Sequence, residues 1–232
     1  MTLRLIIVSL LAAVLLACFA ALGTWQVHRL AWKLDLIERV DARIHADPVP
    51  APAFDAPVAR DADEYRRVSV TGSYLNDDEV LVYTPSDFGP AYWVLTPLQR
   101  ADGSIVMINR GIVPQHNGDI ADFDHIDGET TVTGLLRISE ADGWLFSRES
   151  NPDEQLWYRR DIGSITQAKG FERAAPYFID EELTANSWPR GGQTVVSFRN
   201  SHLSYAITWY ALALMVIGGY GMLLWHEIRH KN

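Results

Sequence analysis

The chain has a long apolar run at each end and a polar middle between them. No charged residue occurs from Leu5 to Val27, and no Lys, Arg, Asp or Glu occurs from Ser201 to Trp225. An α-helix rises 1.5 Å per residue, so about 20 apolar residues cross a hydrocarbon core about 30 Å thick. The pattern therefore predicts two transmembrane helices, over residues 5–25 and 201–225.

The first apolar run has two competing interpretations. Arg4, followed by an apolar stretch with small residues, is typical of a cleavable signal peptide, and Leu15-Leu16-Ala17-Cys18 is similar to a lipid-attachment box. Against both, the apolar residues continue past Cys18 to Trp25 without the polar linker that a processed terminus usually carries. This continuation favours an uncleaved transmembrane span.

Beyond the first run the hydrophobic period remains helical until prolines interrupt it. Apolar residues recur every three or four positions over residues 26–45, which predicts an amphipathic helical extension of the first span. The prolines of segment 46–64 are incompatible with a helix and predict an extended, stiff linker. The recurring apolar residues are Leu30, Leu34, Ile37, Val40 and Ile44, and the prolines are Pro48, Pro50, Pro52 and Pro57.

From residue 65 to residue 199 the pattern changes to that of β-strands. Valines alternate with other residues on both sides of the polar segment Asn76–Glu79, which indicates a hairpin. The apolar runs Tyr92–Leu98 and Ser104–Asn109 flank Ala101-Asp102-Gly103, and an Asp-Gly pair between two such runs is a strong hairpin signal. Further predicted strands are Thr130–Ile138, Tyr177–Ile179 and Thr194–Phe198, and the one internal segment with a helical pattern is Gln155–Lys169.

These elements define the expected fold. It consists of two transmembrane α-helices that flank a mostly β extramembrane domain at 65–199, antiparallel and either barrel-like or strongly curved, with one or two short helices. The single cysteine excludes a disulfide framework and a cysteine-based zinc cluster.

The charge of the chain limits the classes of partner it can bind and indicates its orientation in a membrane. Asp and Glu number 29 against 20 Lys and Arg, for a net charge of −9, and all but one of the acidic residues lie between the two apolar runs. This balance disfavours nucleic acid as a partner, because non-specific binding depends on neutralising phosphates. An acidic domain also fits the outer face of a membrane better than the anionic inner leaflet.

The signatures of common enzyme classes are absent from the sequence. It contains no G-x-S-x-G, no Walker loop, no H-E-x-x-H and no G-x-G-x-x-G. Acidic pairs such as Asp77-Asp78 and Glu181-Glu182 stand in turn-like settings, where solvated loops are the simpler interpretation. We therefore expect no catalytic residues.

The histidine that begins the second span is the strongest candidate for chemistry. An ionisable side chain at such a position needs a partner or a function. Tyr205, Ala206 and Trp209 follow His202 at +3, +4 and +7, which places them on one helix face. This face could hold a planar macrocycle with His202 as an iron ligand. It could equally be a packing face against the first span, and His202 an ordinary interfacial histidine.

Three separated motifs carry a resemblance to a known family. They are Leu22-Gly23-Thr24-Trp25-Gln26-Val27-His28-Arg29 at the end of the first run, Val94-Leu95-Thr96-Pro97-Leu98 with Ile108-Asn109-Arg110-Gly111-Ile112-Val113-Pro114 in the middle, and Asn200-Ser201-His202-Leu203-Ser204-Tyr205-Ala206-Ile207-Thr208-Trp209-Tyr210 at the second run. In this order they resemble the Surfeit locus protein 1 family of cytochrome c oxidase assembly factors. The resemblance covers essentially the whole chain.

The resemblance implies a role, a cargo and a location. The family assists biogenesis of haem-copper terminal oxidase, at insertion of haem a into the largest subunit, subunit I. Carried over, the haem a ligand, and hence the metal-binding residue, is His202. The expected location is the inner membrane of a bacterium, with residues 1–4 and 226–232 cytoplasmic and the domain periplasmic. Expected partners are subunit I, other oxidase assembly factors and the lipid bilayer. The alternative is a cofactor-free scaffold that stabilises assembly intermediates.

The remaining candidate site residues follow from where the two spans would meet. If both helices cross, Trp25–Arg29 and Asn200–Trp209 reach the same membrane face. Arg29 is then available to haem propionates, although snorkelling to the interface is the simpler role for it. Trp25 and Trp209 would supply flat apolar walls, and Tyr205 shares their site. His28 is a conceivable second axial ligand that the family motif does not require.

Overall fold

The structure is a computed structural model that describes residues 3–87, 89–116, 119–141, 148–152, 155–182, 188–193 and 200–229. The chain divides into two compact units. One is helical and combines Met1–Arg39 with Val196–Asn232, and the other contains Val40–Val195.

The helical unit is built from the part of α1 (Leu3–His45, 43 residues) that ends at Arg39 and from α4 (His202–Arg229, 28 residues). Both are long and apolar enough to cross a membrane, and the most apolar windows of the two helices are 0% and 6% buried. Side chains with so little protein cover match helices that face lipid. The two long apolar helices expected at the ends of the chain are confirmed, and α1 continues without a break as far as His45.

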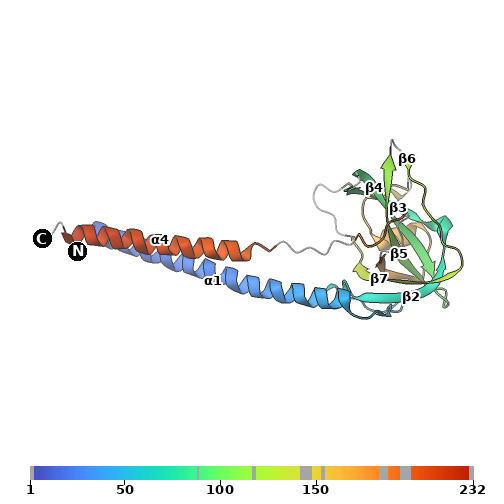
Figure 1. Ribbon diagram of the computed structural model, residues 1–232, viewed down its shortest axis with the longest axis horizontal. Coiled ribbons are helices and arrows are strands. Elements are labelled where there is room, and N and C mark those ends of the chain that lie inside the picture. The colour runs from blue at the N-terminus through green and yellow to red at the C-terminus, as the bar shows by residue number, and fades with distance from the viewer. Residues whose placement is uncertain are drawn as a thin grey trace. The chain divides into compact units, whose positions relative to one another are not determined.

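The two helices are antiparallel neighbours, so the first residues of α1 lie beside the last residues of α4 (Figure 1). Ser9 Oγ and Tyr220 Oη are 2.6 Å apart near that end. Further along, a Cβ added to Gly23 would lie 2.9 Å from the ring of Tyr210, so α1 and α4 pack closely at this point. The beginning and the end of the described chain therefore lie at the same end of the helix pair.

The β unit contains an eight-stranded sheet within the described residues. Seven strands follow the order β1-β2-β7-β8-β5-β4-β3, and β6 pairs with β5 outside this order. Pairing of β2 with β4 closes β2, β7, β8, β5 and β4 into a barrel (Figure 1). The expected mostly β, barrel-like domain is confirmed, although β5 pairs with β8, and β1 with β2, in parallel. The strands are β1 (Val49–Pro50), β2 (Arg67–Tyr74), β3 (Val80–Ser86), β4 (Gly89–Gln99), β5 (Ile105–His116), β6 (Asp119–Ile120), β7 (Glu129–Ile138) and β8 (Ala174–Glu181), and the short helices are α2 (Arg60–Asp63), η1 (Asn76–Asp78) and α3 (Ile162–Ala168).

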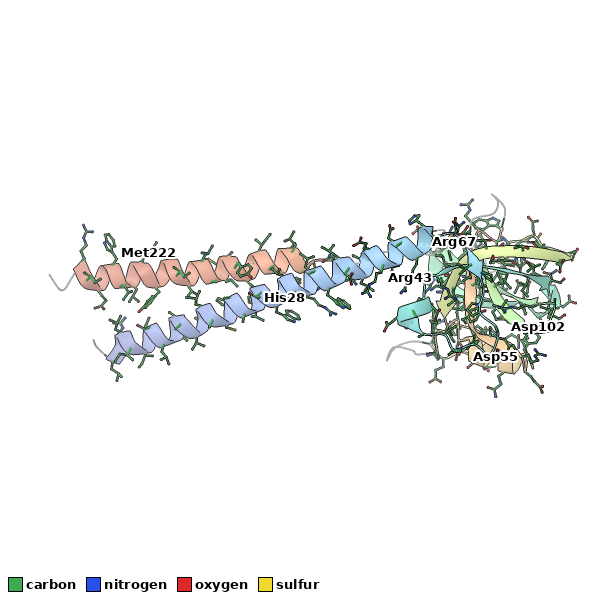
Figure 2. All side chains as sticks on the ribbon, turned by 90° about the horizontal axis from the view of Figure 1, so that it is seen from below. His28, Arg43, Asp55, Arg67, Asp102 and Met222 are labelled. Atoms are coloured by element: carbon green, nitrogen blue, oxygen red, sulfur yellow. The ribbon has the colours of Figure 1, made fainter. Side chains whose placement is uncertain are left out.

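One predicted hairpin is wrong. The strands on either side of Asn76–Glu79 are β2 and β3, but β2 pairs with β7 and β4, and β3 pairs only with β4 among the described strands. The 3₁₀ turn η1 connects the two strands without pairing them. Polar turn residues indicate that the chain changes direction, whereas barrel closure decides which strand becomes the neighbour. The hairpin at Asp102-Gly103, between β4 and β5, is confirmed, and Figure 2 labels Asp102 at this turn.

The predicted internal helix is shorter than expected. Of Gln155–Lys169, only α3 is helical. Gln155 has φ of 54°, and Trp157 is 3% exposed and forms a bridge with Val82, so the first residues of this segment belong to the sheet and its core. The helix begins after Asp161, because the Asp161 side chain accepts a hydrogen bond from Ser164 N and caps α3.

The other predicted elements have different outcomes. The strands at 130–138 and 177–179 are present as β7 and β8, and the strand predicted at 194–198 lies outside the described residues. Segment 46–64 contains β1 and α2, and Ala51, Phe54 and Val58 pack against the barrel core. This proline-containing segment is therefore held against the β unit at several points.

A buried charged network lies inside the β unit. Asp180 on β8 is 4% exposed and accepts hydrogen bonds from Asn109 Nδ2 at 2.7 Å, Arg137 Nη1 at 2.8 Å and Arg160 Nη1 at 3.2 Å. Both arginine side chains are 12% exposed. Because these donors come from β5, β7 and the segment before α3, one carboxylate joins four parts of the fold.

Glu181 predicts a pH-dependent stability. Burial raises the pKa of this carboxyl group from 4.5 to about 7, although Arg110 acts to lower it. The folded state therefore binds more protons than the unfolded state between about pH 4.5 and pH 7, and the free energy of unfolding falls by up to about 3 kcal/mol as pH rises through this range. In Glu181→Gln we expect this contribution to be absent, as measured by thermal unfolding of the detergent-solubilised chain from pH 4.5 to 8.

The neighbouring carboxylate provides the control. Glu182 is partly exposed and pairs with Arg67 at 2.6 Å. We expect Glu182→Gln to keep the decrease in stability between pH 4.5 and pH 7. An identical pH profile for wild type and Glu181→Gln would show that Glu181 does not cause the decrease.

Candidate functional site

His202 is held at the N-terminus of α4 by a contact with α1. Its Nδ1 lies 2.8 Å from Gln26 Oε1. Gln26 is only 8% exposed, whereas His202 is half-buried. Asn200 Oδ1, just before the helix, accepts a hydrogen bond of 3.4 Å from His202 N. The imidazole of His202 is therefore oriented by Gln26 of α1, and the backbone of His202 is held by Asn200.

The predicted face of α4 is divided between helix packing and exposure. Ala206 is 3% exposed, and the Trp209 ring stacks on Phe19 with centroids 5.8 Å apart. Tyr205 is 54% exposed. His202, Ala206 and Trp209 thus face α1, as expected for a packing face against the first span, and Tyr205 is turned outward.

Trp25 and Arg29 do not contact His202 but lie beside it. Trp25 is 57% exposed, and the Arg29 guanidinium lies 3.8 Å from the centroid of the Trp32 ring. At about 100° of rotation per residue, Trp25, Arg29 and Trp32 fall about 60° to 120° from Gln26 in one direction around α1. They form an exposed surface immediately next to the helix–helix contact.

Tyr205 lies on the same side of the helix pair as this surface. The contact between Gly23 and Tyr210 marks one side of the helix pair. Around α1, Gly23 lies about 60° from Gln26, in the direction opposite to Trp25. Around α4, Tyr210 lies about 80° from His202. Tyr205 is rotated about 60° from His202 in the opposite direction. The antiparallel pair therefore presents Trp25, Arg29 and Tyr205 together, next to His202.

His28 is not brought together with His202. It is exposed on α1 and lies about 200° around the helix from Gln26, on the side away from α4 (Figure 2). The structure therefore offers no geometry in which His28 and His202 could bind opposite sides of one iron.

Gln26 is the site residue that the sequence interpretation missed. It lies within the first of the three family motifs but received no role. The available signal was its helical phase, because Gln26 is seven residues after Phe19 and three after Gly23, both of which contact α4. A polar side chain on the packing face of an apolar helix needs a partner, and here that partner is His202.

The residues present fit a planar iron-containing macrocycle. Within the described chain, Nδ1 is the only ring nitrogen of His202 that has a hydrogen-bond partner, which leaves Nε2 for a metal. Trp25 and Tyr205 offer exposed aromatic rings, and Arg29 offers guanidinium donors of the kind that bind carboxylates. No group of three or more His, Cys, Asp or Glu among the described residues could hold a metal ion.

Comparison with known proteins places these residues in a family. The sequence pattern of the SURF1 family matches residues 13–214, which includes Gln26 and His202. The chain is 35% identical to Surfeit locus protein 1 of Rattus norvegicus over 211 residues, covering 82% of this chain and 67% of the rat protein. Identity to Surfeit locus protein 1 of Homo sapiens is 35% over 213 residues, covering 83% and 69%. A SURF1-like protein of Monosiga brevicollis is 31% identical over 228 residues, covering 91% and 83%.

Proposed function

Because the chain belongs to the SURF1 family, we propose that it is an assembly factor for haem-copper cytochrome c oxidase that binds haem a and assists its insertion into subunit I. The observation that carries the proposal is the placement of His202. Its imidazole is oriented by Gln26, retains one ring nitrogen without a partner in the described chain, and adjoins an exposed surface of aromatic rings and one arginine.

Haem a is the cargo in this proposal, and each site residue has a defined task. His202 supplies an axial nitrogen, and Trp25 and Tyr205 cover part of an apolar ring face. Arg29 can pair with a propionate, because its guanidinium is exposed on the same side. Trp209 acts indirectly by packing on Phe19 and fixing the rotation of α4. No bond of the cargo is changed by these residues.

An exposed site suits temporary binding. Trp25 and Tyr205 are 57% and 54% exposed, so they do not enclose a ligand in a deep cavity. A cargo held by one axial nitrogen and one open surface can leave without unfolding of the helix pair. The arrangement thus supports holding and handing over.

The same proposal includes a location and partners. The antiparallel helices bring residues 3–4 and 226–229 to the same end of the helix pair, which supports termini on one side of a membrane, and the acidic middle domain suits the outer side. We place the termini in the cytoplasm and the domain in the periplasm of a bacterium, with subunit I, other assembly factors and the lipid bilayer as partners. Cysteine labelling from each side of the membrane tests this topology.

The test of function compares full-length protein purified in detergent from cells with and without haem a synthesis. We expect a haem a absorption spectrum only when haem a is made, together with co-purification of subunit I. Colourless protein from haem a-producing cells, with subunit I still attached in both strains, would contradict haem handling and favour the cofactor-free scaffold. That alternative has its own support, because His202 and Trp209 both participate in helix packing.

A further inference from the structure

The contact between Gln26 and His202 indicates which ring nitrogen of His202 carries the hydrogen atom. A neutral imidazole carries one N–H and one nitrogen lone pair. The Gln26 atom 2.8 Å from His202 Nδ1 is Oε1, which can only accept a hydrogen bond. With Oε1 turned towards it, a neutral His202 donates from Nδ1, and the lone pair is then on Nε2.

We propose that Gln26 is a positioning residue that holds His202 in the Nδ1–H tautomer and thereby presents Nε2 to a haem iron. The inference rests on the proposed function for the identity of the ligand, but the tautomer is a property of the chain itself. Histidines that bind metals usually donate their second ring N–H to an acceptor, which fixes the ring orientation and raises the basicity of the ligating nitrogen. Here the acceptor comes from the other helix.

The surrounding contacts make this pairing a defined feature of the helix pair. Ser9 with Tyr220, Phe19 with Trp209, and Thr24 with Tyr210 at 3.1 Å fix how α1 and α4 are aligned. With this alignment, the buried amide of Gln26 would lose its partner if His202 turned away. An unsatisfied buried polar group is destabilising, so the imidazole is held in one orientation.

The first experiment measures the tautomer directly in the protein without haem. The full-length chain, with ¹⁵N-labelled histidine and in detergent micelles, is examined by NMR, and His202→Ala assigns the signals. We expect His202 to show a protonated Nδ1 and an unprotonated Nε2, and this preference to disappear in Gln26→Leu. A wild-type His202 protonated on Nε2 would overturn the inference, because it would require the Gln26 amide to be rotated so that its NH₂ group donates to Nδ1.

Thr24→Val is the matched control. It removes the neighbouring interhelical hydrogen bond to Tyr210 without touching His202. We expect Thr24→Val to keep the wild-type tautomer. If Thr24→Val changes the tautomer as much as Gln26→Leu does, the effect comes from loosened helix packing and the assignment to Gln26 is wrong.

The second experiment titrates the same proteins with haemin. Loss of a hydrogen-bonding partner of a metal ligand typically lowers metal affinity 10- to 100-fold, so we expect a loss of about this size in Gln26→Leu and a near-normal affinity in Thr24→Val. Gln26→Glu should keep binding but shift the reduction potential of the bound haem to a more negative value, because a carboxylate polarises Nδ1–H more strongly. A wild-type affinity and potential in both Gln26 variants would overturn the positioning role.

The two experiments also separate this inference from the proposed function. Failure of the wild-type chain to bind haemin and haem a would remove the haem-handling function. The NMR result would still decide whether Gln26 sets the tautomer of His202.

Discussion

The His202→Ala variant is expected to bind haemin more than about 100-fold more weakly than the wild-type chain. Loss of a hydrogen-bonding partner of a metal ligand alone costs about 10- to 100-fold, and removal of the ligand itself should cost more. The exposed surface of Trp25, Arg29 and Tyr205 can still attract a flat ring, but only weakly, because it has no metal ligand. The measurement is a titration of the full-length protein in detergent, followed by the haem absorption band.

His28→Ala is the control for this prediction. His28 is exposed on the side of α1 away from α4, so its removal should leave the haemin affinity unchanged. A similar loss in both variants would indicate that haemin binds non-specifically to histidines. Unchanged affinity in His202→Ala would remove His202 from the site, even if the wild-type protein is pigmented.

Replacement of Asp180 by alanine is expected to lower the free energy of unfolding of the β unit by about 1–3 kcal/mol. The substitution leaves Arg137 and Arg160, each with a side chain that is 12% exposed, without the carboxylate to which both donate hydrogen bonds. Asn109 also loses its acceptor. Arg160 keeps Glu140 at 2.6 Å, and Arg137 keeps Glu64 and Glu140 at 3.6 Å, so the cost is that of buried donors left without an acceptor and not of unpaired charges. Chemical denaturation of the full-length chain, followed by tryptophan fluorescence, measures the loss.

A more exposed carboxylate on the same unit provides the comparison. Glu182 pairs with Arg67 at 2.6 Å, but both side chains are partly in water. We therefore expect Glu182→Ala to destabilise the protein much less than Asp180→Ala. Equal effects of the two substitutions would show that burial of Asp180 does not control the stability of the barrel.

The candidate site could be located from sequence but not assembled from it. Charge-free runs and the position of His202 identify where a ligand-binding residue should be. Whether Tyr205 or Trp209 faces the other helix depends on the rotation of α4, and neighbouring positions on a helix face differ by only tens of degrees. In the structure the Tyr210 ring lies against Gly23, and Tyr205 is turned outward.

The β unit shows a similar division. Asp102-Gly103 specifies its hairpin locally, and β4 and β5 pair as expected. The segment around Asn76 also reverses the chain, but β2 finds its partners in β7 and β4. Trp157 likewise overrides the helical pattern of its segment, because its side chain is buried in the barrel core.

By itself the sequence determined the two apolar helices, the β character of the middle and the hairpin at Asp102-Gly103. These features depend on composition, turn chemistry and periodicity, all of which are set by residues close together in the chain. The tertiary structure alone decided the partners of β2, the convergence of three donors on Asp180 and the pairing of Gln26 with His202. Each of these joins residues far apart in the chain, and close packing selects them by which surfaces meet and which buried polar groups must be satisfied.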